Sequence, residues 1–200
     1  MPTTPGIDSP LYSVADEAEL VRQRLPGATL LIEDPAATAH LPTKATVLAH
    51  LGACAIAHFA CHGHSHPSDP SQSLLLLHDH DTDPLTVASL APIRFDHARL
   101  AYLSACRTAF SSATELIDEA IHLTAAFQLA GYPHVVGTLW EINDAIAVRV
   151  ADAFYTTLTT SDNTIDTTGA ARALHHGVRA IRDQLPATPS LWAAYLHAGT

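Results

Sequence analysis

Cys106 and His62 are the two residues of this sequence whose types and positions best fit nucleophilic catalysis. A thiol becomes an efficient nucleophile when a neighbouring base or cation favours its thiolate form. Cys106 ends an apolar run that is predicted to be a strand, and the polar pair Arg107-Thr108 follows it. His62 also comes after a predicted strand. The hypothesis is therefore a thiol nucleophile with an imidazole as its general base.

Gly63, which follows His62, is a candidate residue of an oxyanion hole. A residue without Cβ lets a substrate carbonyl approach its backbone amide closely. The amide of Cys106 would be the second donor, and such a donor is commonly worth about 3 kcal/mol to the developing oxyanion. The other two thiols fit the nucleophile role less well. Cys54 lies inside an apolar run, and Cys61 precedes His62 in an extended segment, where successive side chains point to opposite faces.

Asp118, Glu119 and Trp140 are candidates for a substrate pocket. The two carboxylates would select a basic side chain before the scissile bond. Alternatively, they complement the positive end of a helix dipole, as carboxylates in a first helical turn commonly do. Trp140 would line a substrate groove, or it packs in the core or at the rim where an apolar strand ends. Both alternatives stay open for each residue.

A histidine-rich stretch offers a second kind of chemistry. Its candidate metal ligands are His64, His66, His78 and His80, close to His62. Alternating residues of a strand share one face, and alternating imidazoles can bind zinc. The alternative is a solvated, mobile loop over the cleft, because no ligand set as strict as HExxH is present. We favour the loop and keep the metal site as a rival hypothesis.

Composition and charge exclude several classes of function. The chain has 200 residues, of which 48% are hydrophobic and 15% charged, which predicts one globular domain. A formal net charge of -10 disfavours nucleic acid and anionic membrane surfaces as partners. Three cysteines without CxxC spacing indicate the reducing cytoplasm, and no apolar run is long enough to span a bilayer. The Pro- and Thr-rich residues 1–10 show no secretory signal, and we expect them to form a flexible segment.

Strands and helices are predicted to alternate along the chain. The predicted strands are 29–32, 54–60, 73–77, 100–103 and 134–140. Predicted helices cover 14–25, begin after Thr43, open at Ser112, open at Asn143 or Asp144, and end before Pro186. This order favours an α/β sandwich with a mostly parallel sheet covered by helices on both faces. Because catalytic groups collect beyond the carboxyl ends of such strands, we expect His62 and Cys106 to meet at one edge of the sheet.

Two segments resemble the signature segments of the CHAT domains, caspase-like peptidases that are often fused to helical repeats. They are His58-Phe59-Ala60-Cys61-His62-Gly63 and Leu103-Ser104-Ala105-Cys106-Arg107-Thr108. Four later segments continue the resemblance in order: 118–122, 127–131, 136–144 and 191–195. The resemblance runs from about Pro10 to Gly199 and therefore covers almost the whole chain.

The resemblance implies a caspase-like three-layer sandwich over 11–200. It also implies a cysteine endopeptidase with a dyad of His62 and Cys106, a thioester acyl-enzyme and no cofactor. The substrate would be a protein or peptide, and a regulatory partner or repeat domain would control the reaction. Family members usually carry more sequence before the matched region, so the resemblance implies a minimal version that lacks the family's N-terminal part. The alternatives are a catalytically silent CHAT-fold module that signals by binding and, behind it, a His-rich metal-binding protein.

Overall fold

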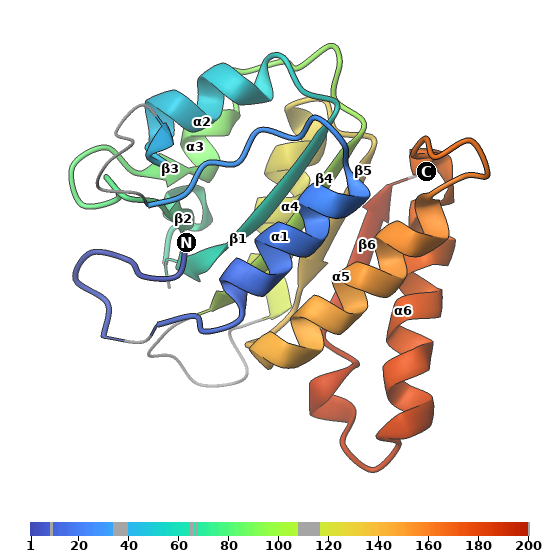
Figure 1. Cartoon of the computed structure of the whole chain (residues 1–200). Helices are drawn as coiled ribbons and strands as arrows, with labels where there is room; N and C mark the ends of the chain where they lie inside the picture. Colours follow the sequence, from blue (N-terminus) through green and yellow to red (C-terminus); the bar gives the residue numbers. More distant parts are fainter. Residues whose placement is uncertain (9, 34–39, 65, 67, 108–116, 200) are drawn as a thin grey trace.

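A six-stranded sheet in the order β3-β2-β1-β4-β5-β6 forms the centre of the computed structural model (Figure 1). Its strands are β1 (Ile56–His64), β2 (Leu74–Leu76), β3 (Leu85–Thr86), β4 (Leu100–Arg107), β5 (His134–Thr138) and β6 (Tyr195–Gly199). The structure describes residues 1–8, 10–33, 40–64, 66, 68–107 and 117–199, with the backbone alone at 105–107 and 117–122. β1, β4 and β5 pair in parallel, and β2 and β6 run against the other four strands. The predicted mostly parallel sheet is confirmed.

Helices cover both faces of this sheet, which confirms the three-layer sandwich. One face carries α1 (Val14–Arg24), α5 (Asp144–Leu158) and α6 (Ala170–Gln184), and the other carries α2 (Lys44–Leu51), α3 (Val87–Leu90) and α4 (Ile117–Leu129) (Figure 1). β4 supplies both cores, because alternate residues of a strand point to opposite faces. Leu100 and Tyr102 pack with α5 and α6, whereas Ala101 and Leu103 pack with the opposite helices. None of the described helices has the length and apolar character needed to cross a membrane.

Two predicted helix starts are confirmed by capping contacts. The side chain of Thr43 accepts a hydrogen bond from Thr46 N, at 3.2 Å, at the start of α2. Asn143, rather than Asp144, caps α5 and accepts from Ile146 N at 3.2 Å. The predicted cap at Ser112 lies outside the described residues.

The predicted strand at 29–32 is wrong. These residues form no strand, and they line a cavity between α1, α2 and β1. An apolar run predicts burial, but a strand also needs a partner for its main-chain groups. Residues 29–32 have the apolar character of a strand, but they pair with none of the strands that the structure describes.

The strand predicted at 54–60 ends later than expected, because β1 continues through His64. β2 folds back antiparallel on β1 and pairs Leu76 with His62 and Leu74 with His64. A hairpin partner of this kind supplies the ladder that keeps polar residues in a strand. His62 therefore lies within the sheet rather than in the loop that follows it.

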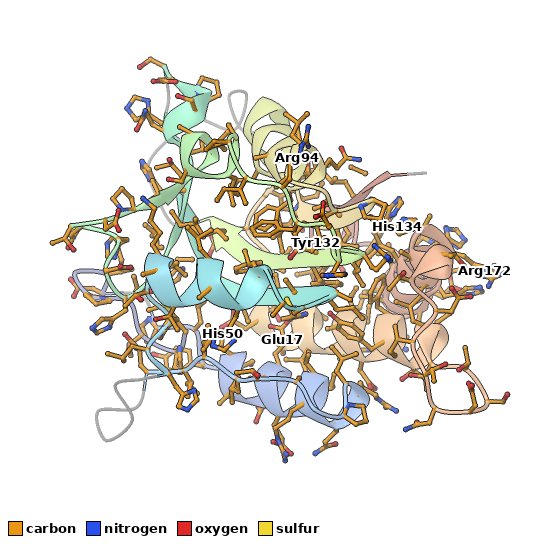
Figure 2. The ribbon with its side chains drawn as sticks, turned by 90° about the horizontal axis from the view of Figure 1, so that it is seen from above. Glu17, His50, Arg94, Tyr132, His134 and Arg172 are labelled. Atoms are coloured by element: carbon orange, nitrogen blue, oxygen red, sulfur yellow. The ribbon has the colours of Figure 1, made fainter. Side chains whose placement is uncertain are left out.

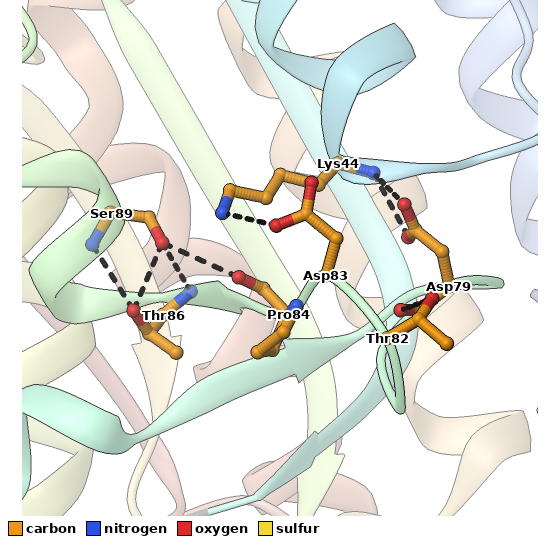
Figure 3. Close-up of polar contacts among 7 residues, drawn as sticks. All are labelled: Lys44, Asp79, Thr82, Asp83, Pro84, Thr86 and Ser89. Atoms are coloured by element: carbon orange, nitrogen blue, oxygen red, sulfur yellow. Dashed lines mark hydrogen bonds and ion pairs between the residues drawn. The ribbon is translucent and has the colours of Figure 1, made fainter.

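The loop after β2 is tied to α2 by a charged cluster (Figure 3). The Asp79 carboxylate accepts from the main-chain N–H of Lys44 at 3.0 and 3.2 Å, where α2 begins. The Lys44 ammonium donates to Asp83 at 2.7 Å. A capping box of Thr86 and Ser89 then opens α3. The contacts of Asp79 and Asp83 with Lys44 hold the loop between β2 and β3 against the start of α2.

Residues 1–10, for which we expect flexibility, contact the core at their first residue. The Met1 side chain is buried among core residues, and its ammonium donates to the carbonyl of Ala60 on β1. Burial lowers the pKa of this ammonium. Leu11 N donates to Pro2 O at 2.9 Å and closes the segment on itself.

Gly131 occupies a junction that has no room for a side chain. It adopts a φ of 116°, and a Cβ there would lie 2.7 Å from the carbonyl oxygen of Phe95. Gly27 also has a positive φ, 86°, but a Cβ there would meet nothing within 4 Å. Replacing each glycine by alanine therefore distinguishes the cost of backbone strain from the cost of steric overlap.

Gly131→Ala is expected to lower the free energy of unfolding by about 3 kcal/mol, because strain and overlap both act. Gly27→Ala is expected to cost about 1 kcal/mol, because strain acts alone. Urea unfolding followed by circular dichroism measures both values. Equal losses would show that the contact with Phe95 relaxes without cost.

A pair of histidines joins β5 to β6 and makes stability depend on pH. His134 Nδ1 lies 3.2 Å from His197 Nε2. Burial lowers the pKa of both imidazoles, and the charge of His134 lowers that of His197 further. The unfolded chain therefore binds more protons than the folded chain once the pH falls into the ordinary histidine range. Stability from this pair is complete above that range and is lost as the pH falls.

We expect the free energy of unfolding to decrease between about pH 7.5 and about pH 5.5, and to decrease less in His197→Gln. The exposed His176 provides the matched control, because His176→Gln should leave the pH dependence as in the wild type. Urea titrations at both pH values give the comparison. An unchanged pH dependence in His197→Gln would rule out the pair as its source.

Candidate active site

The parallel pairing of β1 with β4 brings His62 and Cys106 together. The register runs from Ile56 opposite Leu100 to Gly63 opposite Arg107, and it sets the Cα of His62 opposite the Cα of Cys106. Both residues lie near the carboxyl ends of their strands, where α/β sheets carry their sites. The side chain of Cys106 belongs to the part of the chain that the structure does not describe. The described structure therefore places the backbones of His62 and Cys106 side by side.

The imidazole of His62 is fully buried, with 0% of its surface exposed. The backbone of His62 lies between two strands, since Leu76 of β2 and Cys106 of β4 are its register partners. A substrate carbonyl cannot reach a side chain with no exposed surface. In this conformation, access to the imidazole requires a rearrangement nearby.

Gly63 is likewise buried between two strands. Its register partners are Leu75 on β2 and Arg107 on β4. A main-chain N–H inside a sheet points along the sheet towards a neighbouring strand. Donation from Gly63 to an oxyanion would require its N–H to face the substrate instead, and this role stays a prediction.

The three candidate pocket residues lie on different elements. Asp118 and Glu119 are in the first turn of α4, and the structure describes only their backbone. Trp140 follows the end of β5, and its indole N–H donates to the carbonyl of Ser190 at 2.9 Å. It packs beside a small cluster around Ile142. A role in substrate binding stays a prediction for all three.

The candidate metal ligands contact separate protein groups. His66 Nδ1 accepts from Asp69 N at 3.0 Å, and His78 Nδ1 lies 3.1 Å from the carboxylate of Glu33. His80 Nδ1 donates to the carbonyl of Leu77 at 2.9 Å. Among the residues that the structure describes, no group of three or more His, Cys, Asp or Glu side chains is arranged to hold a metal ion. His64 is included in that search.

A buried polar network on β1 was missed by the sequence analysis. His58 Nδ1 lies 3.0 Å from the Tyr155 hydroxyl, and His58 Nε2 lies 3.1 Å from Glu17 Oε1. The ring of His58 stacks on Tyr102 at 4.8 Å. Burial, followed by the nearby Glu17, raises the pKa of Tyr155, so its hydroxyl stays protonated. A neutral His58 can accept from Tyr155 and donate to Glu17 at the same time.

This network fixes α1 and α5 to β1, the strand that carries His62. Glu17, labelled in Figure 2, is only 3% exposed. The sequence contains a signal for it, because Glu17 follows Val14 by three residues and precedes Val21 by four. That spacing places it on the apolar face of the helix, where a lone carboxylate needs a buried partner.

The two thiols whose side chains are described are both protonated at neutral pH. Burial raises the pKa of Cys61 to about 11. Burial also raises the pKa of Cys54, which lies beside Leu51 and Tyr132. Thiolate is the reactive form of cysteine, so neither residue is suited to be a nucleophile.

We expect iodoacetamide at about pH 7.5 to leave Cys61 unmodified in the folded protein and to modify it once urea unfolds the chain. Peptide mass spectrometry resolves the three cysteines separately. The half-buried Cys54 serves as the internal comparison and should react slowly. Rapid modification of Cys61 in the folded protein would contradict its burial.

A comparison with known protein families matches nearly the whole chain, including the two strands that carry His62 and Cys106. The family model of the CHAT domain matches residues 3–200, which include β1, β4 and all the elements of the sheet. A search of curated proteins returned no match. Because the family model spans nearly the full length, the resemblance seen in the sequence is confirmed. The chain belongs to the CHAT domain family, which is related to the caspase-like peptidases.

Proposed function

We propose that this protein is a cysteine endopeptidase in which Cys106 is the nucleophile and His62 the general base. The observation that carries the proposal is the register of β1 with β4, which pairs these residues near the carboxyl ends of adjacent parallel strands. Membership of a family related to caspase-like peptidases supports the same assignment. The raised pKa values of the other two thiols favour Cys106 as the reactive cysteine.

The proposed reaction passes through a thioester. His62 removes the proton of the Cys106 thiol, and the thiolate forms a bond to the carbonyl carbon of the scissile peptide. The amides of Gly63 and Cys106 stabilise the resulting oxyanion. The C–N bond breaks as His62 gives its proton to the leaving amine. Water activated by His62 then hydrolyses the thioester and releases the carboxylic acid and the free thiol, and no cofactor takes part.

The proposed substrate is a protein segment with a basic side chain before the scissile bond. Asp118 and Glu119 would bind that side chain, and Trp140 would line the groove. A reactive thiol is maintained in a reducing compartment, so the cytoplasm is the proposed location. We also propose that a partner or sensor domain controls the peptidase activity.

The complete burial of His62 favours a resting conformation that must open before catalysis. A partner that rearranges the elements covering His62 would expose this imidazole, which has no exposed surface here. The same observation favours the second candidate function, a catalytically silent CHAT-fold module that signals by binding. Peptide cleavage by the purified chain separates the two functions.

A mixture of fluorogenic peptides tests the proposal with the wild type, Cys106→Ala, His62→Ala and the control His66→Ala. We expect cleavage that persists in EDTA and falls by at least about 100-fold in both dyad variants. His66→Ala should cleave like the wild type, since its described contact is local to the loop. Analysis of the cleaved peptides gives the preference at the position before the bond.

Two other outcomes would contradict the endopeptidase. Cleavage lost to EDTA and retained by Cys106→Ala would assign the chemistry to a metal bound by the His-rich stretch. If neither the wild type nor any variant cleaves a peptide, while circular dichroism shows that all are folded, the chain would be assigned to the catalytically silent binding modules.

A further inference from the structure

The outward face of α6 carries a row of basic and imidazole side chains. α6 packs beside α5 and over β6, at one end of its helical layer (Figure 1). Its buried residues are Ala170, Ala173, Leu174, Gly177 and Ile181. On the opposite side, five exposed side chains recur every three or four residues and therefore share one face of the helix. We call this row the α6 stripe, which consists of Arg172, His175, His176, Arg179 and Arg182.

Gly177 sets the direction in which the α6 stripe faces. A Cβ at this position would lie 3.1 Å from the carbonyl oxygen of Val150, so α6 and α5 pack closely there. Gly177 precedes Arg179 by two residues, which places it about 200° away around the helix. The stripe therefore points away from this helix contact, and Figure 2 shows Arg172 at the periphery of the molecule.

α6 is basic in a protein that is otherwise acidic. With histidine counted as neutral, its three arginines and one aspartate give it a formal charge of +2, whereas the whole chain carries -10. Among the described helices, the next most basic is α2, where the Lys44 ammonium is paired with Asp83 at 2.7 Å. The α6 stripe is therefore a local positive surface on a chain whose remaining residues carry -12.

Acidic groups of the same chain neutralise the stripe only in part. Arg179 and Arg182 share the single carboxylate of Asp183, at 3.5 and 3.0 Å. Arg172 forms no ion pair with a residue that the structure describes. Exposed ion pairs contribute little to stability, so the carboxylates of a partner can replace that of Asp183.

The size of the stripe favours a short acidic protein segment over a nucleic acid or a membrane. The helix rises about 15 Å from Arg172 to Arg182. A carboxylate stands at each end: Asp183 follows Arg182, and Asp166 caps the short 3-10 turn that leads into α6. A nucleic acid or an anionic membrane extends beyond 15 Å and would meet these carboxylates and the acidic remainder of the surface. A segment with a few spaced Asp or Glu residues can pair with the arginines alone.

We propose that the α6 stripe binds an acidic segment of a partner protein. Arg172 and Arg179 are seven residues apart, which separates them by about 10.5 Å along the helix. Residues three apart in an extended segment are separated by about 10 Å. Carboxylates at that spacing would each pair with one guanidinium, and His175 and His176 can donate further hydrogen bonds between them. The proposal rests on none of the chemistry at Cys106, and its test is independent of peptidase activity.

The probe is a capped decapeptide that carries an uncharged fluorophore, glutamate at every third position and serine elsewhere. Arg172→Gln/Arg179→Gln removes two charges from the stripe. The control Arg22→Gln/Arg24→Gln removes two charges from α1, on the other side of α5 (Figure 1). In about 0.1 M salt the Debye length is about 10 Å, so a charge on α1 acts weakly at α6. Circular dichroism confirms that all the variants fold.

We expect fluorescence anisotropy to show binding that is at least about tenfold weaker for the α6 variant and within about twofold of the wild type for the α1 control. A peptide with glutamine in place of glutamate should not bind. Equal losses in the two variants would show that net charge alone acts. That result, or no binding by the wild type up to about 1 mM peptide, would overturn the proposal.

Backbone NMR shifts locate the bound peptide, and we expect the largest changes at residues 172–182. Tighter binding of an oligothymidylate of equal charge, or of vesicles that contain phosphatidylserine, would assign the stripe to a nucleic acid or a membrane if the α6 variant abolishes it. Self-association of the wild type in sedimentation equilibrium, lost in the α6 variant, would assign the stripe to a second copy of the chain. Each of these assignments, or largest shifts elsewhere, overturns the proposal.

Discussion

The parallel pairing of β1 with β4 is the constraint on which the rest of the structure depends. Its register sets His62 opposite Cys106 and carries both to the same edge of the sheet. The same pairing sends Leu100 and Tyr102 into one core and Leu103 into the other. A slip of one residue would exchange the faces of every side chain on a strand, so burial of both cores also fixes the alignment of the candidate dyad.

β1 is held firmly on its faces and weakly on one edge. On one face, His58 joins Glu17 and Tyr155 in a buried network, and on the other Phe59 packs against Phe127. Along the edge that faces away from β4, the short β2 pairs only at residues 62–64, and a cavity lies beside residues 56–61. The contacts on its two faces and the pairing with β4 therefore hold β1 in the sheet.

The sequence predicted the features that local patterns determine. Alternating strands and helices indicated the covered sheet, and the caps at Thr43 and Asn143 followed from side-chain type and position. The strand predicted from the apolar run 29–32 was wrong, because hydrophobicity does not reveal whether the main chain has a hydrogen-bonding partner. The length of β1 depended on a hairpin partner that folds back over it. Within the candidate site, residue types pointed to His62, but nothing in the local sequence indicated that its side chain is completely buried.

The rate at which iodoacetamide modifies Cys106 at about pH 6, with and without His62, tests the central claim most directly. A paired imidazole favours the thiolate, so the account predicts that Cys106 reacts faster than Cys54 and Cys61 in the same sample. In His62→Ala the rate at Cys106 should fall to about that of Cys54. Slow modification in the wild type, or an unchanged rate in His62→Ala, would contradict a functional pair at His62 and Cys106.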